Sequence, residues 1–306
     1  MPELPEVENL RQGLKHTILG QRILKIEIRK PKLVSGKGTL RQASTAKKTE
    51  FIDGIIGEKF TSIERRAKNL IFKLSHGKIV LAHLKMSGQF AYKTNKGLKT
   101  VEGGHPIELS EKELPNKHSH VIFELEKGTL YYNDTRMFGY LLYFPNEKAF
   151  EMENHFEAYG VEPLSKQFTT KYFFEALKNK KGHARGRAGK IKALLMNQKI
   201  VTGLGNIYAD ESLFESKIRP DRSASSISKS EVEKLYKAII HIMKRAIKVG
   251  GSSVATYHLL DDTRGNYARE HKVYGKDGKM CVNCKKPLQK ILIQTRTTIF
   301  CPRCQK

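Results

Sequence analysis

The four cysteines of this chain all lie between positions 281 and 306, with the spacing C-x2-C-x16-C-x2-C, as Cys281, Cys284, Cys301 and Cys304. Two such pairs can supply four thiolates to one tetrahedral Zn²⁺ ion, with each pair on a tight turn. Because protein ligands would fill all four positions, the spacing predicts a structural zinc site rather than a catalytic one. Disulfides or a redox-active pair are the alternatives, and the confinement of every cysteine to one short segment favours a metal in an intracellular protein.

The segment between the two cysteine pairs, KKPLQKILIQTRTTIF at 285–300, has the pattern of a β-hairpin. Its tip is expected to present residues 294–297, so that Arg296 can probe a groove or a phosphate. Zinc binding would contribute on the order of 10 kcal/mol to the folding of this short tail. The tail is therefore expected to depend on its metal for order.

The chain carries a large excess of positive charge, with 56 Lys and Arg against 31 Asp and Glu and a formal net charge of +25 over 306 residues. Such an excess favours a polyanionic partner, either nucleic acid or an anionic membrane. A membrane fits poorly, because no apolar run approaches the roughly 20 residues that span a bilayer and no signal peptide opens the chain. A lysine-rich proteome is the alternative source of the charge. The excess charge therefore favours nucleic acid as the partner, and the lack of a targeting signal favours a cytoplasmic location.

Hydrophobic periodicity divides the chain near residue 145. The first part predicts a helix over 5–18, a strand over 23–28, hairpins over 70–84 and 121–132, and a long polar surface loop over 93–118. The second part predicts helices over 149–159, 172–179, 190–197, 206–216 and 229–249, the last opened by the capping box of Ser228 and Glu231, with a basic stretch over 178–192. A mostly β domain is thus expected to precede a helical one.

The chain opens with MPELPEVE, which places a proline directly after the initiator methionine. If Met1 is removed, Pro2 carries a free secondary amine with a pKa of roughly 8, against roughly 10.4 for a lysine side chain. About one such amine in ten is therefore uncharged at pH 7. An uncharged secondary amine that attacks a sugar carbon forms a cationic iminium, by the logic of a lysine Schiff base. The alternative is an ordinary start with Pro in the first turn of a helix.

Two further motifs suit a nucleic-acid partner. Residues 201–208, VTGLGNIY, join two predicted helices by a glycine turn, where backbone N–H groups or Asn206 could hold a phosphate or cap the helix; a simple interhelical turn is the alternative. Met86 and Phe138, the latter beside Arg136, suit wedges pushed into a base stack, although both could equally be core residues.

Together these motifs resemble one family, the formamidopyrimidine-DNA glycosylases, which are bifunctional base-excision repair enzymes. The matching segments run in order along nearly the whole chain: MPELPEVE at the start, RRAKNL at 65–70, HLKMSG at 83–88, DTRMFG at 134–139, LLMNQKIVTGLGNIYADESLF at 194–214, GGSSV at 250–254, KVYGKDGKMC at 272–281 and the final CPRCQ.

The resemblance implies an α+β fold in three parts. These are an N-terminal β-sandwich domain at 1–145, a helix–two-turns–helix domain at 146–265 and a C-terminal four-cysteine zinc finger at 266–306. It also implies a monomer that acts on damaged double-stranded DNA lying in a cleft between the domains, in a bacterial-type cytoplasm.

The resemblance assigns roles to residues by position. Pro2 resembles the nucleophile at C1′ of the damaged nucleotide, Glu3 the acid that protonates the sugar ring oxygen, and Lys68 a catalytic-site lysine on a phosphate. The other positions that match DNA-binding residues are Glu6 at the sugar, His83, Asn206 and Arg296 at phosphates, and Met86, Arg136 and Phe138 in the gap left by a flipped nucleotide. Ser252, Val254, Ala255, Thr256 and Tyr257 match the loop that covers the extruded base.

Two departures from the family pattern stand out. The family often has Asp-Pro-Arg-Arg-Phe-Gly where this chain has Thr135 and Met137, which puts selectivity for cytosine opposite the lesion in doubt. The chain is also longer around 93–118.

The expected activity is removal of oxidised purines such as 8-oxoguanine, followed by β- and δ-elimination. The rivals are an endonuclease VIII-like enzyme for oxidised pyrimidines and a non-catalytic zinc-finger protein that binds damaged DNA.

Overall fold

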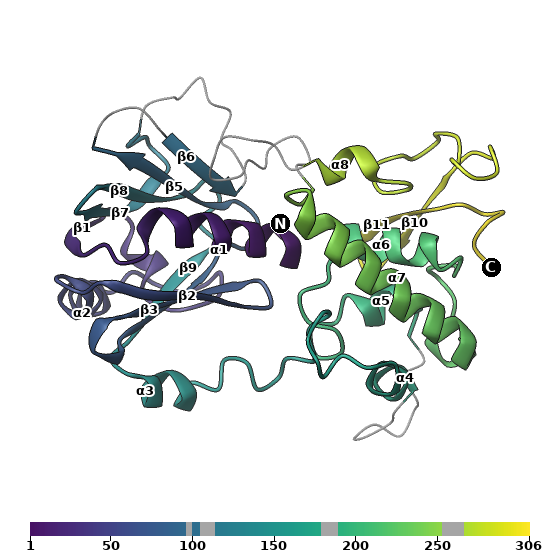
Figure 1. Ribbon diagram of the computed structural model, residues 1–306, viewed down its shortest axis with the longest axis horizontal. Coiled ribbons are helices and arrows are strands. Elements are labelled where there is room, and N and C mark those ends of the chain that lie inside the picture. The colour runs from purple at the N-terminus through teal and green to yellow at the C-terminus, as the bar shows by residue number, and fades with distance from the viewer. Residues whose placement is uncertain (96–99, 105–113, 179–188, 253–265) are drawn as a thin grey trace. The chain divides into compact units, whose positions relative to one another are not determined.

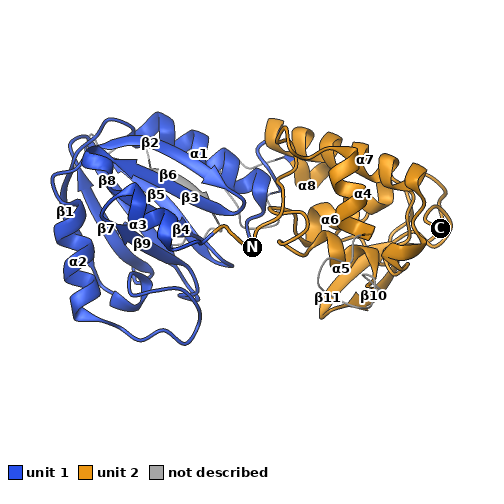
Figure 2. Cartoon of the chain, turned by 90° about the horizontal axis from the view of Figure 1, so that it is seen from below, with its two compact units in different colours: residues 1–155, 249–266 blue, residues 156–248, 267–306 orange. Residues whose placement is uncertain are grey.

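The computed structural model describes residues 1–95, 100–104, 114–178, 189–252 and 266–306, and the chain forms two compact units. The first unit contains residues 1–155 and 249–266, and the second contains 156–248 and 267–306 (Figure 2). The chain therefore leaves the first unit, builds most of the second, and returns before the cysteine-rich tail. The three domain ranges expected from the sequence remain a prediction.

The first unit is a sandwich of two antiparallel sheets (Figure 1). One sheet has the order β1-β7-β8-β5-β6, formed by Ile23–Ile28, Ser119–Leu125, Gly128–Asp134, Gly88–Thr94 and Thr100–Gly104. The other has the order β2-β3-β4-β9, formed by Phe60–Arg66, Asn69–Leu74, Ile79–His83 and Tyr140–Phe144. Aromatic rings join the sheets, since Phe72 of β3 and Phe90 of β5 meet edge-on at 5.6 Å. The predicted sandwich and both predicted hairpins are confirmed.

Helix α1, Leu4–Ile18, runs along the sandwich between the two sheets (Figure 1). Its apolar residues recur at helical spacing, and Val7, Leu10, Leu14 and Ile18 are all buried in the core. Burial of this stripe fixes the direction of the helix, and with it the position of the residues at its start.

The prediction of a surface loop over 93–118 was wrong in part. Strand β5 continues to Thr94, and β6, Thr100–Gly104, pairs antiparallel with it at the edge of the sheet. Ladder hydrogen bonds join main-chain groups, so a polar sequence can add an edge strand without any apolar alternation. Residues 96–99 and 105–113 lie outside the described parts of the chain.

A second helix of this unit, α2 at Thr45–Ile55, was not predicted. Ser44 caps it by accepting a hydrogen bond from the Lys47 backbone N–H. Only Phe51 and Ile55 are buried, so the helix has too narrow an apolar stripe to show a clear period. Gly54 lets the helix approach Tyr143, because an added Cβ would overlap that ring.

Helix α3, Glu147–Met152, is shorter than the predicted 149–159. Asn154 has a φ of 47°, and a left-handed residue at this point ends an α-helix. Within the described residues there are also three short 3-10 helices, at Pro31–Leu33, Ser75–Gly77 and Ala224–Ser226.

The second unit is helical and carries a terminal hairpin. Its elements are α4 at Thr170–Lys178, α5 at Ile191–Leu195, α6 at Asn206–Glu215, α7 at Lys229–Lys248, α8 at Tyr267–Glu270, β10 at Gln289–Ile293 and β11 at Arg296–Phe300. The predicted capping box of α7 is present, since the Ser228 N–H donates to Glu231 Oε2 at 2.8 Å. The mixed α+β architecture expected from the sequence is confirmed, although most of the predicted basic stretch, 179–188, lies outside the described residues.

Glu8 of α1 is expected to make the first unit sensitive to acid. Burial raises the pKa of this carboxyl, but hydrogen bonds from Arg11, Gln12 and Arg65 outweigh that effect and lower the pKa to about 2. A depressed pKa contributes stability above the unfolded value and loses it as the pH falls toward the folded value. Glu8→Gln should therefore lower the free energy of unfolding by about 1–3 kcal/mol at pH 7, with the difference shrinking below about pH 4.

Thermal unfolding of both proteins at pH 7 and pH 3 measures this effect. Glu124→Gln is the matched control, because Glu124 pairs with Lys25 at 3.4 Å while its side chain is 52% exposed. An equal loss of stability in Glu8→Gln at the two pH values would show that Glu8 acts through packing and not through its charge.

Candidate active site and nucleic-acid interface

The start of α1 places the N-terminal residues in a buried corner of the first unit. Pro2 and Glu3 are buried, and Glu3 is the residue that caps the helix. The Glu6 carboxylate joins two distant segments here: Oε2 accepts from the Glu3 backbone N–H at 2.8 Å, and Oε1 accepts from the Ser252 backbone N–H at 2.8 Å. Glu6 therefore fixes the residue next to Pro2 and the point where the chain returns to this unit.

Glycine is required beside this corner. Gly251 has a φ of +82°, and an added Cβ would lie 2.8 Å from Glu6 Oε1. A side chain there would displace the carboxylate that holds Glu3. Of the predicted lesion loop the structure describes Ser252, whereas Val254, Ala255, Thr256 and Tyr257 lie outside the described residues.

Lys68 lies in the tight turn between β2 and β3. Ala67 takes a φ of 56°, and the turn is held by Arg65 Nη1 donating to the Ala67 carbonyl at 2.9 Å and Asn69 Nδ2 donating to the Arg66 carbonyl at 3.2 Å. Arg65 is in turn fixed by Glu8 of α1, at 2.9 Å. The helix that presents Pro2 thus also braces the turn that presents Lys68.

His83 ends β4 opposite Asn69 in the β3–β4 ladder and is only 7% exposed. Burial, together with the charges of Lys85, Lys68 and His155, lowers its pKa well below 6.5, so the imidazole is neutral at pH 7. Its Nδ1 accepts from the Lys85 backbone N–H at 3.0 Å, which assigns the proton to Nε2. His83 can therefore donate a hydrogen bond to an anion without carrying a charge.

Met86, Arg136 and Phe138 meet in the structure. Arg136 Nη1 lies 3.1 Å from Met86 Sδ, and the Arg136 guanidinium stacks 4.8 Å from the centre of the Phe138 ring. Met86 is 40% exposed and Phe138 is partly exposed, so neither is a core residue; Met137 is the one that packs against the core. We call residues 134–139 the wedge loop.

Asp134 organises the wedge loop and was missed in the sequence. Its Oδ1 accepts from the Arg136 backbone N–H at 3.2 Å, and its Oδ2 accepts from the Gly139 backbone N–H at 2.8 Å. An Asp at the start of a turn commonly captures the following N–H groups, and that preference was the available signal.

In the second unit, the glycine turn is built by a residue that sequence reasoning did not single out. Gln198 Oε1 accepts from the Gly203 N–H at 2.8 Å, and its Nε2 donates to the Leu204 carbonyl at 2.8 Å. The proposed capping role of Asn206 was wrong, because Gly205 is the N-cap of α6 and Asn206 is its first helical residue. Asn206 Nδ2 instead donates to the Thr297 carbonyl of the terminal hairpin at 3.1 Å.

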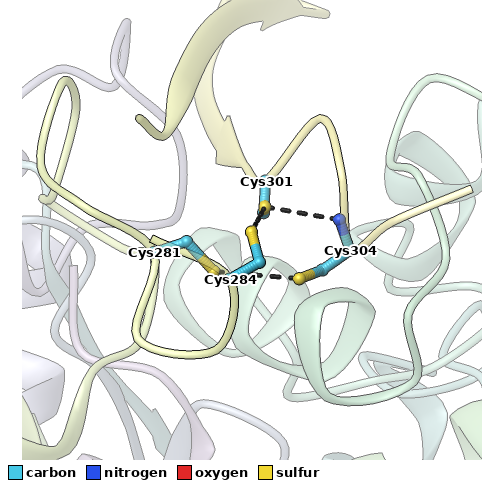
Figure 3. Close-up of side chains that lie close together, drawn as sticks. All are labelled: Cys281, Cys284, Cys301 and Cys304. Atoms are coloured by element: carbon cyan, nitrogen blue, oxygen red, sulfur yellow. Dashed lines mark hydrogen bonds between the residues drawn. The ribbon is translucent and has the colours of Figure 1, made fainter. Parts of the chain in front are cut away.

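The four cysteines converge at the base of that hairpin (Figure 3). Their Sγ atoms all lie within 4.8 Å of one another, with Cys281 and Cys304 at 3.9 Å and Cys284 and Cys301 at 3.4 Å. A tetrahedron with metal–sulfur bonds of about 2.3 Å has edges of about 3.8 Å, so the sulfurs fit one tetrahedral metal ion.

The hairpin tip is tighter than expected. Gln294 and Thr295 form the turn, with φ values of 46° and 61°, and Arg296 and Thr297 belong to β11. Arg296 is exposed directly beside the turn.

A buried ion pair connects this hairpin to the helices. Lys192 and Asp210 are 0% and 1% exposed in their side chains and lie 2.6 Å apart. Lys192 Nζ also donates to Thr298 Oγ1 at 2.7 Å and to the Thr297 carbonyl at 3.2 Å. Burial raises the pKa of Asp210 to about 7, against the opposing effect of Lys192. Sequence reasoning did not single out this pair, because Lys192 lies outside the matching segments and the segment 194–214 that contains Asp210 shows nothing of its partner.

Lys192→Met should therefore destabilise the second unit strongly, by about 3–5 kcal/mol, because it leaves Asp210 buried without its cation. Thermal unfolding measures the loss, and adding Asp210→Leu should restore part of it. Lys290→Met is the matched control, since Lys290 pairs with Asp277 at 2.6 Å with side chains 55% and 41% exposed. A double variant as unstable as the single one would show that packing, not charge, dominates at this site.

None of the helices in the described parts of the chain is long and apolar enough to cross a bilayer. Family models match both halves of the chain: the formamidopyrimidine-DNA glycosylase N-terminal domain at residues 1–141 and the H2TH domain of the same family at residues 159–258. This chain is 37% identical to the formamidopyrimidine-DNA glycosylase of Desulfitobacterium hafniense and 38% identical to that of Listeria monocytogenes. Each alignment covers 100% of both chains.

Solved structures agree over the whole length. The chain is similar to the Lactococcus lactis Fpg in complex with DNA that contains an abasic site, at a TM-score of 0.83 and 33% identity over 99% of both chains. It is similar to a variant of the same protein bound to Fapy-dG DNA, at a TM-score of 0.83 and 33% identity over 100% of both chains.

Proposed function

This chain belongs to the formamidopyrimidine-DNA glycosylase family, and from that membership we propose how its residues perform base-excision repair. The chain is a DNA glycosylase whose substrates are oxidised purines in duplex DNA, such as 8-oxoguanine and formamidopyrimidines. The abasic-site and Fapy-dG complexes of its Lactococcus lactis relative support this substrate class. One observation carries the residue assignment: Glu6 ties the buried Pro2–Glu3 corner to Ser252, where the predicted lesion loop begins.

Pro2 acts as the nucleophile once Met1 has been removed. Its nitrogen forms a bond to C1′, and the bond from C1′ to the damaged base breaks, with its electron pair leaving on the base. Protonation of the sugar ring oxygen by Glu3 then opens the ring and gives an iminium between Pro2 and C1′. A buried corner suits this step because it excludes water that would compete for C1′.

Strand cleavage follows from the iminium. Loss of a proton from C2′ expels the 3′ phosphate by β-elimination, and loss of a further proton expels the 5′ phosphate by δ-elimination. Lys68 and His83 would hold backbone phosphates during these steps, Lys68 by charge and His83 by its neutral Nε2–H. A damaged nucleotide must leave the stack to reach Pro2, since C1′ is inaccessible within the duplex.

Met86, Arg136 and Phe138 would occupy the gap that the flipped nucleotide leaves. Their mutual contacts present one apolar and cationic projection, which matches the wedges that kink DNA. Asn206 and Arg296, which both belong to the second unit, would hold backbone phosphates of the DNA. Asn206 donates to the carbonyl of Thr297, which follows Arg296 in β11, and this connection supports a joint role.

Zinc is the metal that four thiolates at this spacing select, and we assign it a structural role. When bound, it would supply the cross-link that orders the hairpin carrying Arg296. The protein is proposed to act as a monomer on damaged double-stranded DNA in a bacterial-type cytoplasm.

Borohydride trapping tests the catalytic assignment. Processed protein should form a covalent adduct on its N-terminal peptide with a duplex that holds 8-oxoguanine opposite cytosine. Preference for a duplex with an oxidised pyrimidine would favour the endonuclease VIII-like rival. Binding without any adduct would favour a non-catalytic damage-binding protein.

A further inference from the structure

Arg41 lies outside every motif that matches the family, yet it contacts the wedge loop. Its Nη2 donates to the Gly139 carbonyl and lies 3.4 Å from the Met137 carbonyl. Its Nε and Nη1 donate to the carbonyls of Lys32 and Gly38. One guanidinium thus ties the wedge loop to the segment before α2.

The wedge loop needs such a restraint because its centre is strained. Met137 has a φ of 54°, a conformation that side chains other than glycine and asparagine rarely adopt, and it lies between Arg136 and Phe138. A residue remains in this region only when its surroundings hold it there. Relaxation of Met137 would change the directions of both neighbouring side chains.

Two groups hold the loop, one through its backbone N–H groups and the other through its carbonyls. Asp134 takes the N–H groups of Arg136 and Gly139, whereas Arg41 takes the carbonyls of Met137 and Gly139. Gly139 is therefore fixed through both its donor and its acceptor. The loop tip is left with the exposed side chains that would enter DNA.

Arg41 suits this role better than lysine would. It is partly buried, and burial lowers its pKa while the nearby Tyr132, Asp134 and Tyr140 oppose that change. A guanidinium is a rigid fork with five donors, so it can serve four carbonyls from two segments at once, whereas an ammonium offers three donors from one point.

We propose that Arg41 is a positioning residue for damage recognition, which fixes the wedge loop so that Arg136 and Phe138 are pre-arranged for the gap beside a flipped nucleotide. Arg41 then governs the preference for damaged over intact DNA, and not the overall affinity for DNA. The inference rests on the proposed function, because only an enzyme that flips a nucleotide has a gap to fill.

The test compares two dissociation constants for each variant. One is measured on a duplex with a tetrahydrofuran abasic-site analogue, and the other on the same duplex without damage. We define the selectivity ratio as the dissociation constant of the intact duplex divided by that of the damaged duplex. Arg41→Gln and Arg41→Lys should each lower this ratio by at least about tenfold, because a small misplacement of contacting groups is costly. Affinity for the intact duplex should stay within about twofold.

Arg22→Gln is the matched control. Arg22 is an exposed arginine of the same unit that also donates to a backbone carbonyl, that of Gly57, and it does not contact the wedge loop in the described structure. It should leave the ratio unchanged. Phe138→Ala should lower the ratio by itself, and adding Arg41→Gln to it should lower it little further, because both changes disable the same projection.

Three outcomes in the Arg41 variants would overturn the inference. A ratio that stays at the wild-type value in both Arg41 variants would show that the loop holds its place without Arg41. Equal losses of affinity for the damaged and the intact duplex in the Arg41 variants would show that Arg41 has a merely structural role. A loss on both duplexes in Arg41→Gln alone, with a shallower salt dependence, would show a direct phosphate contact, because lysine keeps the charge. A wild-type ratio of one would instead overturn the proposed function, and this inference with it.

Discussion

Protein that retains any residue in front of Pro2 is expected to form no borohydride-trapped adduct and to lose at least about a thousandfold in strand cleavage. The nitrogen of an internal proline belongs to an amide, whose lone pair is delocalised into the carbonyl, so it cannot attack C1′. The α-amine of the added residue is also partly uncharged at neutral pH, but it lies at least one residue further from Glu3 than the Pro2 nitrogen, and a lysine side chain is almost fully protonated at this pH. Mass spectrometry of the N-terminus, paired with trapping on an 8-oxoguanine duplex, measures the effect.

The control carries the same added residues after Lys306 and keeps the processed Pro2. It should trap and cleave as the unmodified protein does, and both proteins should bind a tetrahydrofuran duplex within a few-fold of each other. Trapping by the N-terminally extended protein at the wild-type rate would assign the nucleophile to another residue. A clean loss restricted to the N-terminal extension would leave Pro2 as the nucleophile.

The second large effect is expected from Cys301→Ser. Cys301 is fully buried, and it belongs to a small cluster in which Val273, Leu288 and Ile299 pack against Phe214 of α6. A structural zinc site contributes on the order of 10 kcal/mol, so loss of one ligand should disorder the tail. The hairpin that carries Arg296 would be lost with it, and affinity for damaged DNA should fall at least about a hundredfold.

Zinc content, thermal unfolding and the dissociation constant together measure this outcome. Val282→Ala is the control, because Val282 lies between two of the cysteines and is 43% exposed. Unchanged DNA binding by a zinc-free Cys301→Ser protein would remove the hairpin from the DNA interface. Retention of one zinc per chain would show that three thiolates suffice.

The parts of the fold with strong local signals were predictable from sequence. Helix α1, the hairpins of the sandwich, the capping box of α7 and the four-cysteine site each depend on spacing within one segment. Helix α2 and strand β6 were not predicted, because one has a narrow apolar stripe and the other pairs only through its backbone.

In the candidate site, too, the features with a local sequence signal were predictable and those without one were not. The motifs named Pro2 and Glu3, but the connections that hold such residues join distant segments: Glu6 with Ser252, Glu8 with Arg65, and Arg41 with Gly139. The Glu8–Arg65 pair joins two side chains that lie 57 residues apart, so no local pattern reveals it. Glu6 and Arg41 instead bond to backbone groups, which place no requirement on the partner's side chain, so these hydrogen bonds leave no trace in the sequence. Gln198 escaped notice for the same reason.

The discontinuous first unit has a consequence for how this protein is made. Residues 1–155 leave the ribosome long before residues 249–266, which complete the same unit. Until Ser252 is synthesised, Glu6 lacks one of its two backbone donors, and the corner around Pro2 stays incomplete. Biosynthesis therefore delays assembly of the corner around Pro2 until helices α4 to α7 of the second unit have been translated. A DNA-cutting enzyme whose proposed nucleophile lies in this corner is in this way kept from completing the corner on an unfinished chain.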